Sequence, residues 1–302
     1  MPTGDGITMG LDANAIRFLL YAKTQGVNFT KTAMIGRQKL HLDARLLRKN
    51  LIDFGYSIRN DEIKRLLNER DGYAEPFLQV LGATEICSFD ASDYEDATNI
   101  HDFNLPIDES LKNRFTVVLD AGSLEHIFNF PMAIKNCMEM VELGGHFLGI
   151  TPANNFFGHG FYQFSPELFF RIFSAVNGFR LVRIILFEES LRAQWFEVID
   201  PGAIEQRVTL VNTRPTYLAI IANKVESVPI LIANPQQGYY IALWKSHDNT
   251  AGSNSFSRAF GKFKSRIYKL APDLLRIFYL YIHNQWKIFS RYNPKFFRKM
   301  KV

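Results

Sequence analysis

The sequence has few of the features that mark secreted, metal-stabilised or membrane-spanning proteins. Its 302 residues include only two cysteines, Cys87 and Cys137, and no CxxC pair or Cys/His spacing that would indicate a structural zinc site. We therefore expect two reduced, buried thiols and no metal site. No basic start is followed by an apolar core of the kind found in secretory signals, and no apolar run reaches the roughly 20 residues that cross a bilayer. These absences favour a cytoplasmic protein.

Charge is spread unevenly along the chain, whose net charge is +5. Residues 258–302 hold twelve Lys and Arg residues but one acid, Asp273, so the rest of the chain is net acidic. A helix is predicted over 272–292, with aromatic and aliphatic residues at helical spacing. Basic amphipathic helices are typical of segments that bind anionic membranes, here at the inner face. Packing against this or another protein and binding to nucleic acid are the alternatives.

Predicted strands and helices alternate through the middle of the chain. Apolar and β-branched runs predict strands at 28–36, 84–90, 98–102, 115–120, 146–151, 180–187 and 216–223. Helical spacing predicts helices at 12–23, 42–71, 73–81, 131–143 and 165–176. This alternation favours a Rossmann-like α/β fold, in which a mostly parallel, seven-stranded sheet has helices on both faces.

Composition divides the chain into four parts. Residues 1–27 are predicted to be an N-terminal helix after a disordered start at 1–9, and 28–225 the α/β domain. Residues 226–257 read as an irregular segment and linker, because 244–257 is polar and rich in Gly and Ser. Residues 258–302 form the basic helical tail. Within the domain, 188–214 has little periodicity and is predicted to be a loop.

Acidic and small residues follow the predicted strands where each one ends. The first ends at Gly36, the second at Asp90, the third at Asp102-Phe103 and the fourth at Asp120. Ligands of doubly wound sheets bind at these carboxyl ends. One carboxylate can accept hydrogen bonds from both ribose hydroxyls, and an acid beside an aromatic ring suits adenine. We therefore predict a nucleoside site, although any single acid could be a helix cap or a surface charge.

Two histidines are candidates for a general base, because the imidazole pKa of about 6.5 suits proton transfer near neutral pH. His126 follows the fourth strand, and His159 lies in a Gly- and aromatic-rich loop after the fifth. Tyr162 and Gln163 of that loop are candidate substrate contacts, since its composition is typical of a substrate lid. The alternatives are a helix-start hydrogen bond for His126 and loop packing for His159.

The segment 115–152, FTVVLDAGSLEHIFNFPMAIKNCMEMVELGGHFLGITP, resembles class I S-adenosylmethionine-dependent methyltransferases. The shared pattern is a strand, an LEH turn, a helix, and a Gly-Gly pair before the next strand. The segment 89–102, FDASDYEDATNIHD, resembles the second and third strands of the same family. The resemblance implies a seven-stranded sheet with an antiparallel last strand. It also implies S-adenosylmethionine as methyl donor, with its methionine part over Gly36, its ribose on Asp90, its adenine on Asp102 and Phe103, and its sulfonium near Asp120.

One part of the chain departs from that pattern. The turn after the first strand, GRQKLHLD at 36–43, keeps only the first glycine of the usual Gly-rich loop. This turn and HGFYQFSPELFFRIF at 159–173 resemble bacterial relatives linked to surface-polysaccharide biosynthesis. The resemblance implies methyl transfer to a small-molecule or glycan-linked acceptor. A non-catalytic binding protein of the same fold is the alternative, and a nicotinamide dehydrogenase is disfavoured because GxGxxG is absent.

Overall fold

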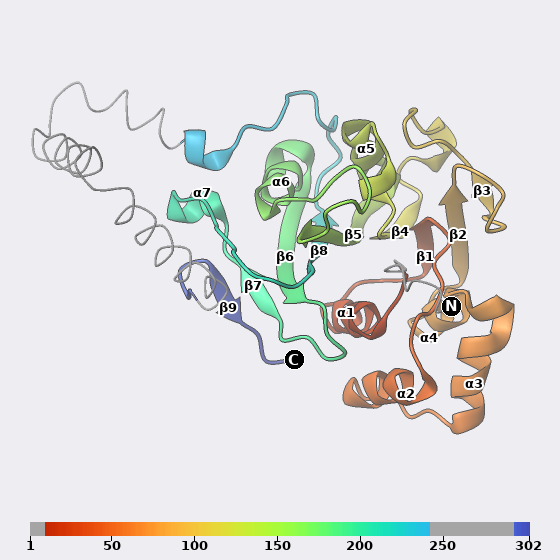
Figure 1. Ribbon diagram of the computed structural model, residues 1–302. Helices are drawn as coiled ribbons and strands as arrows, with labels where there is room; N and C mark the ends of the chain where they lie inside the picture. The colour runs from red at the N-terminus through yellow and green to blue at the C-terminus, as the bar shows by residue number, and fades with distance from the viewer. Residues whose placement is uncertain (1–9, 242–292) are drawn as a thin grey trace, which may run out of the picture.

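The computed structural model describes residues 10–241 and 293–302, which form one mixed sheet covered by helices (Figure 1). The described strands follow the order β3-β2-β1-β4-β5-β8-β6-β7-β9. Their bounds are β1 (Lys31–Ile35), β2 (Glu85–Asp90), β3 (Asn99–Ile100), β4 (Phe115–Ala121), β5 (Val141–Asn154), β6 (Phe179–Glu188), β7 (Phe196–Val198), β8 (Thr216–Lys224) and β9 (Phe297–Lys299). The predicted number of seven strands is therefore wrong, because β7 and β9 extend the sheet.

The first five strands of this order run parallel to one another. β8 then enters between β5 and β6 and is antiparallel to both. The predicted antiparallel last strand of the domain is thus confirmed. β4 is buried along its whole length, which explains its apolar, β-branched sequence, since a central parallel strand is covered on both faces.

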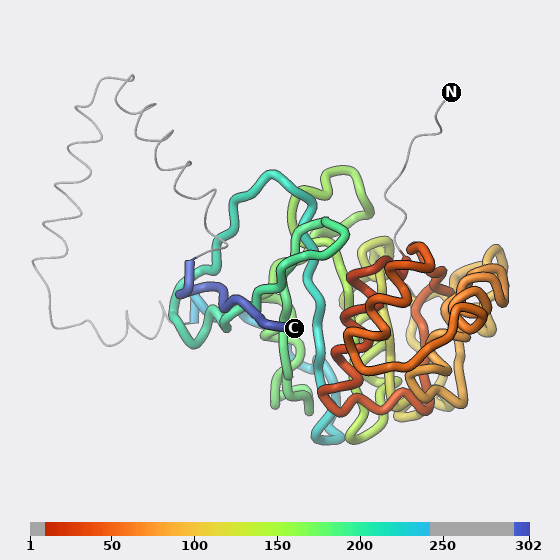
Figure 2. The backbone as a smooth tube through the Cα atoms, turned by 90° about the horizontal axis from the view of Figure 1, so that it is seen from below, coloured from red at the N-terminus to blue at the C-terminus, as the bar shows by residue number. Residues whose placement is uncertain are grey.

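The edge of the sheet is built from two segments that lie about 100 residues apart in the sequence. β7 lies inside 188–214, for which the sequence predicts a loop, and β9 lies in the predicted helical tail. Phe196 pairs with Lys299 and Val198 with Phe297, and Phe297 is only 3% exposed. β9 therefore lies beside β7, at the end of the sheet far from α3 (Figures 1 and 2). The predictions for 1–9, 244–257 and 272–292 fall outside the described residues.

Helices cover both faces of the sheet, as predicted. Their bounds are α1 (Ala13–Thr24), α2 (Ala44–Asp53), α3 (Asn60–Asn68), α4 (Glu75–Val80), α5 (Phe130–Met140), α6 (Pro166–Ile172) and α7 (Pro201–Ile204). Side chains of α1 to α4 share one apolar core with the sheet, and those of α5 and α6 share the core on the opposite face. In the part of the chain that is described, no helix combines the length and apolarity that crossing a bilayer requires.

Helix boundaries follow capping and strand pairing. Asp12 and Ser165 cap α1 and α6 through their side chains, as predicted. The run predicted as one helix over 42–71 is divided into α2 and α3, because Gly55 adopts a left-handed φ of 84° between them. The helix predicted to reach residue 143 ends at Met140, because Val141 already pairs with Phe115 of β4.

Candidate functional site

A cleft lies at the carboxyl ends of the parallel strands, where β1 pairs with β2 on one side and β4 on the other. This is the switch point at which doubly wound sheets bind ligands. The cleft has two parts. The acidic lobe, of about 300 Å³, includes Asp90, Asp102 and Phe103 in its lining. The histidine lobe, of about 410 Å³, includes His126 and His159. The lobes are continuous, since both are lined by Gly36, Asp90, Gly122, Ser123 and His126.

The acidic lobe presents two carboxylates beside an apolar wall. Asp102 accepts hydrogen bonds from the backbone N–H and the Nδ2 of Asn104, at 2.9 and 2.7 Å, and these bonds lower its pKa. Asp90 accepts one 3.3 Å bond from the N–H of Ser92. The ring of Phe103 packs edge-on against Phe89 and is 4% exposed. The structure thus brings together Gly36, Asp90, Asp102 and Phe103, as the sequence predicts.

Asp120 lines neither lobe of the cleft, so its predicted place near the sulfonium stays a prediction. Its side chain is 1% exposed and Oδ1 accepts hydrogen bonds from the N–H groups of Ser123 and Leu124, at 3.0 and 3.2 Å. Burial raises the pKa of this carboxyl. Asp120 therefore holds the turn after β4 through these two bonds.

The turn after β1 is built by side chains where the resemblance leads one to expect glycines. Gly36 has a left-handed φ of 72°, and a Cβ there would lie 2.4 Å from the Oγ of Ser123. The Ile35 carbonyl accepts hydrogen bonds from Gln38 Nε2 at 3.1 Å and from Ser123 Oγ at 2.8 Å. One glycine therefore suffices for the tight turn, and the buried Gln38 closes it.

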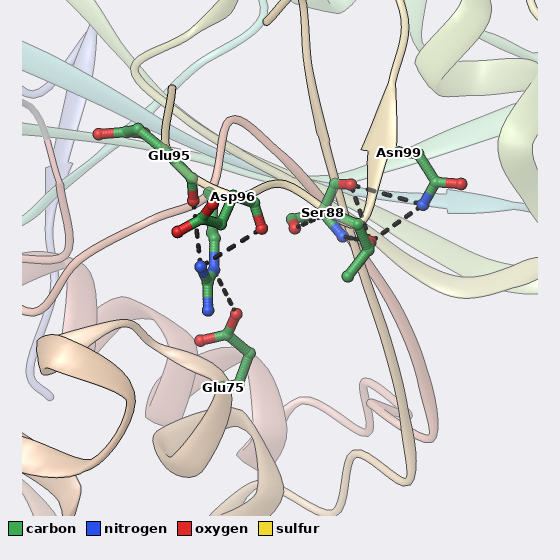
Figure 3. A network of polar contacts seen from close by, with 7 residues as sticks. Glu75, Ser88, Glu95, Asp96 and Asn99 are labelled. Carbon is green, nitrogen blue, oxygen red and sulfur yellow. Dashed lines mark hydrogen bonds and ion pairs between the residues drawn. The ribbon is translucent and has the colours of Figure 1, made fainter. Parts of the chain in front are cut away.

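Arg37 holds a wall of the histidine lobe in place. Its Nε donates to Glu75 at 2.8 Å, and its Nη1 donates to the carbonyls of Glu95 and Asp96 at 3.0 and 3.3 Å. The guanidinium also stacks 3.8 Å above the ring of Tyr73. Figure 3 shows Glu75 on one side of this network and the β2–β3 loop, with Glu95 and Asp96, on the other. Arg37 thus joins the β1 turn to α4 and to that loop.

The two predicted histidines meet in the second lobe. His126 ends a short 3₁₀ turn, η3 (Leu124–His126), and the ring of His159, from the loop after β5, lies 5.0 Å from it between centroids. Partial desolvation at the cleft wall, with the nearby His159, lowers the pKa of His126 and so favours the neutral imidazole at pH 7. Sequence reasoning missed a third member, Glu125, whose Oε1 lies 3.6 Å from His159 Nε2. Glu125 is fully buried, and burial, reinforced by the charge of Asp120, raises its pKa.

The loop after β5 folds over Glu125 and is fastened there. The N–H groups of Phe161 and Tyr162 donate to the Glu125 carbonyl, at 2.8 and 3.3 Å. The Tyr162 hydroxyl donates to the carbonyl of Phe128 at 2.6 Å, and Gln163 Oε1 accepts from Phe156 N–H at 2.9 Å. Neither Tyr162 nor Gln163 lines either lobe. Their polar groups fasten the loop, so the structure does not place these two predicted substrate contacts in the cleft.

Comparison with known proteins gives structural similarities only. No protein-family model matches the chain, and no curated protein matches it. Among solved structures, the 1,6-didemethyltoxoflavin-N1-methyltransferase of Burkholderia thailandensis, solved with S-adenosylhomocysteine, is 12% identical with a TM-score of 0.38; the match covers 71% of this chain and 78% of that one. The branched-chain polyamine synthase of Thermus thermophilus is 11% identical with a TM-score of 0.36, and the match covers 75% of this chain and 61% of that one. The YcgJ protein of Bacillus subtilis is 12% identical with a TM-score of 0.34, and the match covers 70% of this chain and 99% of that one. At these TM-scores the similarity assigns no function.

Proposed function

We propose that this chain is an S-adenosylmethionine-dependent methyltransferase that acts on a small-molecule or glycan-linked acceptor. One observation carries the proposal: a single cleft at the switch point of the sheet joins a lobe suited to a nucleoside to a lobe containing histidines. The first lobe would hold the donor, and the second would hold the acceptor next to it.

The residues of the acidic lobe fit the donor by type. Asp90, at the end of β2, has acceptor capacity for the ribose hydroxyls, because Ser92 uses only one of its carboxylate lone pairs. Asp102 and the ring of Phe103 suit the amine edge and the face of adenine. Gly36 and Gly122, both with positive φ, let a ligand approach the backbone of β1 and β4 closely. When bound, S-adenosylmethionine would supply a methyl group on a sulfonium, which is an excellent leaving group.

The residues of the histidine lobe would align the acceptor and remove its proton. A hydroxyl or amine must present its lone pair in line with the methyl group, and alignment of this kind contributes most of the catalysis in such displacements. His126 and His159 are the candidates for receiving the acceptor proton, and the lowered pKa of His126 leaves it unprotonated at neutral pH. The exposed rings of Phe128 and Phe161, 5.8 Å apart, offer a surface for a sugar or another partly apolar acceptor.

Calorimetric titration of the full chain with S-adenosylmethionine, S-adenosylhomocysteine and NAD in parallel tests the proposal. We expect the first two to bind and NAD not to bind. Binding of NAD alone would indicate a nicotinamide enzyme. Binding of none of the three would support the alternative of a non-catalytic protein. That alternative arises from the unusual turn at residues 36–38. Arg37 and Gln38 bond to other parts of the protein, and of the three residues only Gly36 lines the acidic lobe.

We also propose that the basic segment after residue 258 binds anionic membrane surfaces peripherally. Its basic residues before the predicted helix are Lys262, Lys264, Arg266 and Lys269. Replacing these four with Gln leaves β9 and its pairing with β7 intact, which a truncation at residue 258 would not. Sedimentation with anionic vesicles should then decrease strongly while the melting temperature stays the same. Equal sedimentation of both proteins would reject the membrane role.

A further inference from the structure

Three side chains in the histidine lobe converge on one point. Glu125 and His126 come from η3, and His159 comes from the loop that folds over it. One donor atom from each lies within 4.8 Å of the other two. The sequence does not predict this convergence, because residues 125, 126 and 159 match no known ligand spacing and only the folded loop brings the third to the other two.

The cluster is also the least satisfied polar site in the described part of the chain. Buried polar side-chain atoms in folded proteins nearly always have hydrogen-bond partners. Among the described residues, nine buried side-chain nitrogen and oxygen atoms lack one, and three of these belong to this cluster: both carboxylate oxygens of Glu125 and Nε2 of His159. Within those residues, His159 is the only side chain in ion-pair range of Glu125. Leaving buried polar atoms without partners costs free energy, and one bound cation would give all three atoms a partner.

We propose that Glu125, His126 and His159 bind one divalent transition-metal ion. Two imidazole nitrogens and one carboxylate oxygen, with no thiolate, form a donor set that suits Zn²⁺, Fe²⁺ or Co²⁺ better than Ca²⁺ or Mg²⁺, which prefer oxygen. Three protein ligands leave further coordination positions open. These positions face the histidine lobe, because His126 and His159 line it.

The distances are compatible with such a site after small side-chain rotations. Donors that share a zinc-sized ion lie roughly 3–3.5 Å apart, given metal–ligand bonds of about 2.0–2.2 Å. The Glu125–His159 pair, at 3.6 Å, is already close to this spacing. His126 is exposed on the cleft side, so its ring has room to turn toward the other two.

A metal here would change how the proposed reaction activates its acceptor. This step rests on the proposed function. An acceptor hydroxyl bound to an open coordination position would release its proton to solvent water more readily, because the cation stabilises the resulting alkoxide. Both histidines would then hold the ion jointly, and neither would act alone as the base. Loss of either histidine should therefore have a similar effect.

Titration with Co²⁺ tests the metal site directly, since its absorption bands report the coordination geometry. The tag-free full chain is stripped with chelator and titrated, by absorption and by calorimetry, with no methyl donor present. We expect one Co²⁺ per chain, with visible bands of a low-coordinate site. His126→Ala, His159→Ala and Glu125→Gln should each weaken binding at least about 10-fold.

The matched control is His101→Ala, which removes a histidine from the other lobe of the same cleft and should leave Co²⁺ affinity unchanged. His126 is exposed, so its variant remains informative even if Glu125→Gln is unstable. Absence of stoichiometric Co²⁺ binding, or equal affinity in the wild type and in the three cluster variants, would overturn the proposal. S-adenosylhomocysteine is titrated separately into the metal-free protein. That measurement reports the donor site alone, so failure of the metal site and failure of the methyltransferase assignment are distinguishable.

Discussion

The two lobes of the cleft are built in different ways. In the acidic lobe, Asp90 and Asp102 bond to residues two positions further along the chain, Ser92 and Asn104. In the histidine lobe, the defining contacts join distant segments: Arg37 bonds to Glu75, and the loop holding His159 is fastened to η3. The carboxylates of the first lobe are therefore held by local hydrogen bonds at strand ends that pairing brings together, whereas the second lobe is closed by bonds between remote segments.

This difference indicates that the two lobes should respond differently to mutation. Changes in the acidic lobe should alter ligand affinity and leave stability nearly constant, because its carboxylates carry few structural bonds. Changes in the histidine lobe should alter stability and activity together, since its walls are also tertiary contacts.

Arg37→Met should cause the largest loss of stability. It leaves the Glu75 carboxyl buried, at 7% side-chain exposure, without its cationic partner, and such losses cost about 3–5 kcal/mol. Urea denaturation should show this decrease in the free energy of unfolding. The matched control is Arg59→Met, whose ion pairs with Asp61 and Glu62 are exposed, and which should cost less than about 1 kcal/mol. Equal effects at the two positions would contradict a structural role for Arg37.

Gly160→Ala should cause the next largest loss of stability. Gly160 has a φ of 69°, a conformation that costs an alanine about 1–2 kcal/mol, and the new Cβ would lie 2.8 Å from the Glu125 carbonyl oxygen. Gly158 is the control, because its φ is 86° but a Cβ added there would meet no atom within 4 Å. We expect Gly160→Ala to lower the melting temperature and methyl transfer more than Gly158→Ala does. If the two variants melt and turn over alike, the loop is not fastened over η3 as described.

Asp90→Ala should weaken S-adenosylhomocysteine binding about 10- to 100-fold, as expected for loss of charge-assisted hydrogen bonds worth roughly 1.5–3 kcal/mol. The free energy of unfolding should change little, because the carboxylate makes one long hydrogen bond in the protein. Asp93→Ala, in the loop that follows, is the control and should keep wild-type affinity by calorimetry. Undiminished binding in Asp90→Ala would remove the ribose assignment.

The smallest expected effect concerns the two thiols, which should differ in their reactivity toward a disulfide reagent. Burial raises the pKa of Cys137 strongly and that of the half-buried Cys87 as well. A raised pKa means less thiolate at pH 8 and hence slower reaction with a disulfide reagent. We expect Cys87 to react slowly in the native protein and Cys137 only after denaturation. Rapid native labelling of both would contradict the packing of α5 against the sheet.

The sequence predicted a residue's position correctly where that position follows from the end of a strand. Gly36, Asp90, Asp102 and Phe103 line the acidic lobe because consecutive parallel strands bring their carboxyl ends to one edge. Asp120 occupies an equivalent position but lines neither lobe. There the next turn folds back and uses the carboxylate as a cap, and no sequence spacing distinguishes that arrangement from an open one.

The sequence also did not predict the features that form where two remote segments meet. Glu125 follows a buried leucine in a short turn and would be read as a surface acid, but the loop fastened by Phe161 covers it completely. β7 and β9 are too short to show strand periodicity; β7 forms by pairing with β6 and β9, and β9 forms by pairing with β7. These features depend on contacts that the order of residues does not encode locally.

Local sequence by itself determined the alternation of strands and helices, the caps at Asp12 and Ser165 and the acids at the ends of β2 and β3, because hydrophobic periodicity and capping act over a few residues. Only the tertiary structure decided that Glu125 is buried beside two histidines and that the end of the chain completes the sheet. Burial and long-range pairing depend on which distant segments come to lie side by side, and the same residues would be solvated in an isolated segment.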